Sequence, residues 1–177
     1  MEIPFFNIEF TEEMKNAAIT SLQNEKFVLG ESVFKFEEEF ARYIGTKYAI
    51  SVNSGNAALH LSLLSLGINQ NHKVITSTNS FIASSNCILM CGAKPVLCDI
   101  SESDGNMDIS TNNDDFDAII PVHIYGNPCD YDSIAEISEE GEIPIIEDAA
   151  QAHGATLNNK KIGSLGTVGC FSFYTTK

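Results

Sequence analysis

The chain has 177 residues, 44% of them hydrophobic, and a formal net charge of -14. It is long enough to bury a sizeable core and too apolar to be disordered, while the acidic balance argues against a nucleic-acid or anionic membrane partner, since both favour a basic surface. No apolar run approaches the ~20 residues of a membrane-spanning helix, and residues 1–10 lack the basic region and cleavage site of a secretory signal.

Two helices are predicted near the amino-terminal end. The first covers residues 12 to about 24, with Thr11 as its N-cap and two glutamates at the positive end of its dipole. The second covers residues 32–44, where aromatic residues partly follow helical spacing and Gly45 is a natural stop. We expect both helices to pack on a core without chemistry of their own.

A strand, a polar turn and a helix follow. Residues 48–52 are predicted to form a buried strand, residues 53–56 the turn, and residues 57–66 a helix closed by Gly67. The free N–H groups and the dipole at the start of such a helix can bind an anion such as phosphate. Many strand–helix turns share this pattern, so an ordinary turn remains the alternative.

Short strands and helices then alternate. Strands are predicted over residues 73–76, 94–99 and 118–122, helices over residues 84–91 and 130–140, a polar loop over residues 101–117, and a tight turn between two short strands at Asn158 and Asn159. The alternation predicts an α/β fold with a mostly parallel, doubly wound sheet.

Five cysteines are scattered along the chain without a CxxC pair: Cys87, Cys91, Cys98, Cys129 and Cys170. Their number is odd and their surroundings are mostly apolar. The pattern favours buried free thiols in a cytoplasmic protein over disulfides or metal ligands.

The richest cluster of polar residues lies near the carboxyl-terminal end. An apolar strand stops at Glu147 and Asp148, Gln151 and His153 follow, and a second apolar run over residues 170–174 leads to Lys177. Ligands of an open α/β sheet bind beyond the carboxyl ends of its strands. Each residue alone fits a structural role, as a cap, a rim histidine or a surface lysine. Together they predict a binding site.

The combination of Asp148 and Lys177 indicates one cofactor in particular. Lysine forms Schiff bases in pyridoxal 5'-phosphate (PLP) chemistry, and PLP also needs an Asp or Arg partner for its pyridine nitrogen. An ionised Asp148 keeps that nitrogen protonated, so that the ring can act as an electron sink. The two side chains must therefore face the same ring from different strands.

Four segments resemble the sugar aminotransferases of the DegT/DnrJ/EryC1/StrS family, which are fold-type I PLP enzymes. They are EDAAQAHGA at residues 147–155, KIGSLGTVGCFSFYTTK at residues 161–177, SGNAALH at residues 54–60 and SFIAS at residues 80–84. The likeness covers nearly the whole chain, although Asn56 stands where the family often has threonine. The resemblance implies an aspartate aminotransferase-like large domain over residues 1–177, incomplete at its carboxyl-terminal end and without the small C-terminal domain.

The resemblance also implies roles for single residues. Lys177 forms the Schiff base with PLP and acts as the proton shuttle, and Asp148 pairs with the pyridine nitrogen. The remaining cofactor contacts are Gln151 near the phenolic oxygen, Phe81 stacked on the ring, and Ser172 with Gly55 and Asn56 around the phosphate. Asn56 can offer both backbone and side-chain hydrogen bonds there.

The implied reaction moves an amino group, with glutamate the usual donor, to a keto group of a nucleotide-linked sugar. The resemblance further implies a homodimer for the full-length protein, which we expect in the cytoplasm, and the acidic charge predicts no nucleic-acid or membrane partner. Since the family continues beyond the lysine into the rest of both domains, we expect the 177 residues alone to be inactive.

Three other hypotheses remain. Related sugar dehydratases have a histidine in place of the lysine, and Lys177 argues against them. A truncated or regulatory relative could bind PLP weakly or not at all. A metal site formed by His123, His153, Glu147 and Asp148 is disfavoured, because no pair has the helical HxxxH spacing.

Overall fold

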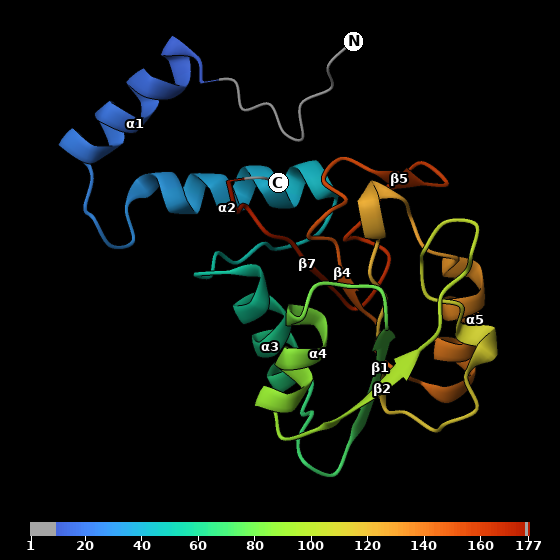
Figure 1. Cartoon of the computed structure of the whole chain (residues 1–177). Helices are drawn as coiled ribbons and strands as arrows, with labels where there is room; N and C mark the ends of the chain where they lie inside the picture. Colours follow the sequence, from blue (N-terminus) through green and yellow to red (C-terminus); the bar gives the residue numbers. More distant parts are fainter. Residues whose placement is uncertain (1–9, 176) are drawn as a thin grey trace. The chain divides into compact units, whose positions relative to one another are not determined.

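The computed structural model describes residues 10–175 and Lys177, and these fall into two compact units, residues 10–51 and residues 52–175 with Lys177 (Figure 1). The prediction about a secretory signal concerns residues that lie almost entirely outside the described range. The assignment of residues 1–177 to one large domain stays a prediction.

The first unit contains the two predicted helices, α1 (Glu12–Asn24) and α2 (Glu31–Ile44). Thr11 caps α1 by accepting a hydrogen bond from the N–H of Met14, and Gly45 ends α2 with a φ of 91°. The expectation that both helices pack on a core is wrong for α1, which has no buried residue. A helix buries its apolar face only where a partner covers it, and Met14 and Leu22 are exposed.

Residues 48–52 have no regular structure, so the predicted strand is wrong. Tyr48 and Ile50 are 72% and 82% exposed. A strand requires a neighbour to satisfy its backbone N–H and C=O groups, and no strand in the described part of the chain pairs with this segment.

The second unit contains the α/β core. Its helices are α3 (Gly55–Ser65), α4 (Ala83–Met90) and α5 (Tyr131–Gly141), and its parallel strands are β1 (Lys73–Ser77), β2 (Lys94–Cys98), β3 (Ala118–Ile120), β4 (Ile146–Asp148) and β7 (Val168–Cys170). Two short helical turns, η1 (Ile109–Thr111) and η2 (Ile124–Gly126), lie in loops. The antiparallel pair β5 (Thr156–Leu157) and β6 (Lys160–Lys161) is joined by Asn158 and Asn159, as predicted.

The parallel strands follow the order β2-β1-β3, with β4-β7 beside them. Parallel bridges from Ile119 to Ile145 and from Val122 to Asp148 connect the two groups. Every pairing in this run is parallel, which confirms the predicted sheet.

Both faces of the sheet are covered. Because successive side chains of a strand point to opposite faces, Val74 packs with α3 and α4 while its neighbour Ile75 packs with α5. In the same way, Ile120 packs with α3 and α4, and its neighbour Ile119 packs with α5. The fold is therefore doubly wound, and the carboxyl ends of β1, β3, β4 and β7 meet at one edge.

All five cysteines are free, and four of them are buried. Burial raises the pKa of Cys87, Cys129 and Cys170 to about 12, so these thiols stay protonated at neutral pH. The prediction of buried free thiols is confirmed except at Cys91, which is half-buried. None of the helices among the described residues is long and apolar enough to cross a membrane.

Candidate functional site

Asp148 ends β4 and is 5% exposed. Its Oδ2 accepts a hydrogen bond from Ser84 Oγ at 2.7 Å, and its Oδ1 accepts one from the N–H of Ala150 at 3.2 Å. Burial raises the pKa of the carboxyl above its ordinary value, although these hydrogen bonds and the positive charge of Lys177 act in the opposite direction. A cationic or N–H partner stabilises the ionised form of such a buried carboxyl.

The start of α3 has free donors. Ser54 caps the helix by accepting from the N–H of Ala57, and no acceptor among the described residues is paired with the N–H of Gly55 or of Asn56. Together with the helix dipole, such N–H groups form an anion site.

Ser172 lies directly beside this helix start. A Cβ atom added to Gly55 would come within 3.0 Å of the Cβ of Ser172 and 3.3 Å of the carbonyl oxygen of Phe171. A side chain at residue 55 would therefore crowd the segment after β7, which would have to move by a few tenths of an ångström. The structure thus brings together Gly55, Asn56 and Ser172, which the sequence grouped as one phosphate site.

The side chain of Asn56 points elsewhere. Its Nδ2 lies 3.5 Å from the Sδ of Met90 on α4, and its Oδ1 is buried with no hydrogen-bond partner among the described residues. The expected side-chain hydrogen bond to a ligand is therefore not prepared here, and Asn56 can contribute its backbone N–H.

Phe81 lies between β1 and α4 and is 71% exposed. Its carbonyl oxygen accepts a hydrogen bond from the N–H of Ser84 at 3.1 Å and lies 2.9 Å from Ser80 Oγ. The backbone of this residue is thus fixed while its ring remains available for stacking.

Gln151 is oriented by a residue that the sequence did not single out. Its Oε1 accepts a hydrogen bond from the N–H of Tyr125 at 3.0 Å, and Tyr125 has the left-handed φ of 58°. Because the oxygen is engaged with a donor, the amide nitrogen is the side left to donate. A non-glycine residue with positive φ is uncommon and is often found at functional sites.

Lys177 is exposed, and its backbone N–H donates to the carbonyl oxygen of Tyr174 at 2.8 Å. Its positive charge lowers the pKa of Asp148, which puts the two groups within electrostatic range.

Partial burial lowers the pKa of His153, and the charge of Lys177 adds to this effect, although a hydrogen bond with the backbone of Ser172 opposes it. The ring of His153 contacts those of Phe171 and Phe173.

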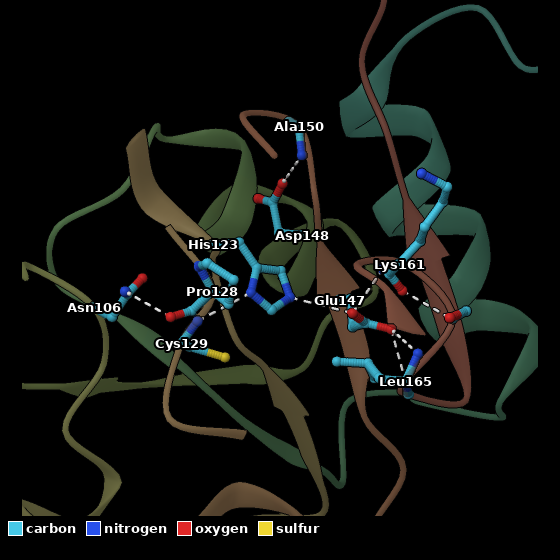
Figure 2. A network of polar contacts seen from close by, with 12 residues as sticks. Asn106, His123, Pro128, Cys129, Glu147, Asp148, Ala150, Lys161 and Leu165 are labelled. Carbon is cyan, nitrogen blue, oxygen red and sulfur yellow. Dashed lines mark hydrogen bonds and ion pairs between the residues drawn. The ribbon is translucent and has the colours of Figure 1, made fainter. Parts of the chain in front are cut away.

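Glu147 precedes Asp148 but belongs to a separate network, shown in Figure 2. Its carboxylate is fully buried and accepts hydrogen bonds from the backbone N–H groups of Gly163, Leu165 and Gly166 at 2.7–2.8 Å. A fourth comes from the ring of His123 at 3.2 Å. Burial alone would raise the pKa of Glu147, but the hydrogen bonds from His123 and the backbone outweigh it and hold the pKa below its usual value.

His123 has both ring nitrogens engaged. Its Nδ1 accepts from the N–H of Cys129 at 3.2 Å, so the ring proton lies on Nε2 and is donated to Glu147. The pair connects the loop after β3 with the loop before β7. No group of three or more potential metal ligands was found in the part of the chain that the structure describes.

The chain was compared with known proteins. The profile of the DegT/DnrJ/EryC1/StrS aminotransferase family matches residues 9–177. GDP-perosamine synthase of Caulobacter vibrioides is 42% identical over 84% of this chain and 41% of its own length. The dTDP-3-amino-3,4,6-trideoxy-alpha-D-glucose transaminase of Streptomyces venezuelae is 37% identical over 99% of this chain and 48% of its own.

The fold is similar to that of solved aminotransferases. The X-ray structure of the aminotransferase from Psychrobacter cryohalolentis has a TM-score of 0.90 and 35% identity, and the match covers 97% of this chain and 46% of that one. The chain spans about half the length of the relatives that it matches.

Proposed function

The chain belongs to the DegT/DnrJ/EryC1/StrS aminotransferase family, and on that premise we propose that it binds PLP and serves amino transfer to a keto group of a nucleotide-linked sugar, with glutamate as donor. The observation that carries the proposal is the carboxyl of Asp148 at the end of β4, which is buried, accepts hydrogen bonds from Ser84 and Ala150, and has its pKa raised by burial. A protonated pyridine nitrogen is a cationic partner for that carboxylate.

The residues at the strand ends fit the rest of the cofactor. The N–H groups of Gly55 and Asn56, with the hydroxyl of Ser172 beside them, suit a phosphate. Phe81 offers an exposed ring, and the amide nitrogen of Gln151 can donate to a phenolic oxygen.

PLP supplies an electron sink when it is bound. In the proposed site the carboxylate of Asp148 would stabilise the protonated ring nitrogen, and the amine of Lys177 would hold the cofactor and serve as the acid and base that moves a proton at the substrate carbon. Low exposure of Asp148 keeps water from its carboxylate and strengthens its pairing with a cation.

The partners belong to the same proposal. We propose a nucleotide-linked keto sugar and an amino-acid donor as substrates, and a homodimer in the cytoplasm as the working state. The free cysteines suit a reducing compartment. The exposed apolar side chains of Phe27, Val28 and Leu29 suit burial against another chain.

A direct test is to titrate the chain with PLP, record the visible absorbance band of lysine-linked cofactor, trap the link with borohydride and locate the added mass. We expect the mass on Lys177 and no band in Lys177→Ala. The matched control is Lys160→Ala, which removes an exposed lysine of β6 and should leave the band unchanged. An unaltered band in Lys177→Ala, or none in the unsubstituted chain, contradicts the proposal.

A further inference from the structure

Ser84 is the one side chain that donates a hydrogen bond to Asp148 among the described residues. It lies in the first turn of α4, is 1% exposed, and is 2.7 Å from Oδ2 of Asp148. A buried hydroxyl is placed against a buried carboxylate across 64 residues of sequence. Hydrogen bonds to charged groups are among the stronger ones in proteins.

Ser80 extends this contact into a chain. An ionised carboxylate can only accept, so the proton of Ser84 points to Asp148, and the oxygen of Ser84 is free to accept from Ser80 Oγ at 2.7 Å. Ser80 Oγ also lies 2.9 Å from the carbonyl oxygen of Phe81. With its one proton donated to Ser84, Ser80 cannot also donate to that carbonyl oxygen, which accepts from the N–H of Ser84 at 3.1 Å. Ser84 therefore contacts the buried acid through its hydroxyl, and through its backbone N–H it contacts the aromatic residue proposed to stack on the cofactor.

We propose that Ser84, supported by Ser80, is a positioning residue that keeps the carboxylate of Asp148 ionised and aimed at the cofactor ring. The inference rests on the proposed function, because it assigns the serines to the same site. Neither serine contacts the reacting atoms. Their effect passes through Asp148, and through the backbone of Phe81.

The other groups around Asp148 do not replace this hydrogen bond. Cys87 of α4 and Cys170 of β7 are thiols whose pKa is raised to about 12 by burial, so they remain neutral near pH 7. The ring of His123 donates its proton to Glu147, on the other side of β4 (Figure 2). The N–H of Ala150 donates to the other oxygen, Oδ1, and the charge of the exposed Lys177 adds a further favourable interaction with Asp148.

The test compares Ser84→Ala with Ser84→Thr, which retains a hydroxyl, and with Ser85→Ala as a matched control. Ser85 is the next residue of α4, and its hydroxyl bonds only to the carbonyl oxygen of Ile82 in the described structure. The dissociation constant of PLP is measured at pH 7.5. We expect it to rise about tenfold in Ser84→Ala and to change less than about threefold in the other two variants.

A pH series separates positioning from a merely structural role. Removal of the hydroxyl makes protonation of Asp148 easier, so the pH at which PLP is lost on acidification should rise by about one unit in Ser84→Ala. A loss of packing alone would weaken the chain without moving that midpoint. The hydroxyl in Ser84→Thr should restore the midpoint of the unsubstituted chain.

Ser80→Ala is the second variant, for use if Ser84→Ala does not fold. It removes only the outer hydroxyl, so we expect the changes in the dissociation constant of PLP and in the pH midpoint of PLP loss to be about a third as large as in Ser84→Ala. If the unsubstituted chain forms the lysine-linked band and both serine variants match it in affinity and midpoint, the role of Ser84 is overturned while the proposed function stands. Absence of the band in the unsubstituted chain overturns the proposed function itself.

Discussion

The two carboxylates of β4 are neighbours in sequence and opposite in environment. Glu147 and Asp148 are 0% and 5% exposed. Glu147 accepts four hydrogen bonds, and its pKa is lowered; Asp148 accepts two, and its pKa is raised. The two carboxyls are similarly buried, yet their pKa values are shifted in opposite directions, because Glu147 has more hydrogen-bond donors than Asp148.

The difference assigns the two acids to different tasks. Because side chains alternate along a strand, Glu147 faces the loop that contains Leu165 (Figure 2), and Asp148 accepts a hydrogen bond from Ser84. The fully paired acid stabilises the fold that holds β4 and β7 together. The acid with fewer hydrogen bonds is the one that we propose contacts the cofactor, since carboxyls with a perturbed pKa are often functional.

Glu147→Gln should have the largest effect on stability. Each carboxylate oxygen accepts two hydrogen bonds, one from Leu165 and Gly166 and the other from Gly163 and His123. Whichever oxygen becomes the amide NH2 leaves two buried donors unpaired, so we expect a loss of about 3 kcal/mol in the free energy of unfolding. Urea denaturation followed by circular dichroism measures it.

The matched control is Glu139→Gln, an exposed glutamate of α5, which should change the free energy by less than about 0.5 kcal/mol. If the two variants are equally stable, the structural role of Glu147 is wrong.

Most of the fold could be predicted from local pattern. Thr11, Gly45 and Gly67 end or begin helices as expected, and Asn158 and Asn159 form the turn because both tolerate positive φ. The prediction failed at residues 48–52, whose apolar pattern suits a strand. The pattern is local, but a strand exists only with a paired neighbour.

The site could be predicted in part. The group of Gly55, Asn56 and Ser172 is brought together as expected, because motif segments at strand ends meet at one edge of a parallel sheet. Ser84 and Tyr125 were missed, since their contacts with Asp148 and Gln151 cross 64 and 26 residues of chain. No local spacing encodes such a contact.

The separate role of Glu147 was also missed. In sequence it is one member of an acidic pair, and although alternation along a strand places the two side chains on opposite faces, it does not show which donors each of them meets. His123 is 24 residues away, and its importance depends on the donor from Cys129 that fixes its tautomer.

Asp148→Asn should have a smaller effect on stability and the opposite sign. The substitution removes a buried charge whose pKa is raised and keeps the shape, so we expect PLP-free chain to gain about 0–1 kcal/mol. Asp115→Asn, an exposed control, should be neutral. The same variant should bind PLP at least about tenfold more weakly, because the partner of the ring nitrogen is lost. A destabilisation like that of Glu147→Gln would show that Asp148 is structural.

The pH dependence of stability gives the finest comparison, because the two acids should respond in opposite directions. Asp148 has a folded pKa above its ordinary 3.8. As pH rises from 3.8 to the folded pKa, the folded state therefore keeps the proton that the unfolded state has lost, and the free energy of unfolding falls. Glu147 has a folded pKa below 4.5, so its contribution is present above 4.5 and is lost as pH falls below it.

Urea denaturation of PLP-free chain between pH 3.5 and 7 therefore separates the two by difference. The advantage of Asp148→Asn over the unsubstituted chain should grow as pH rises and then level off. The deficit of Glu147→Gln should shrink as pH falls below 4.5, because the unfolded carboxyl then takes up a proton more readily than the folded one and the unsubstituted chain loses stability. If both differences moved in the same direction with pH, the two carboxyls would share one environment, and the division of β4 into a structural acid and a ligand-binding acid would be untenable.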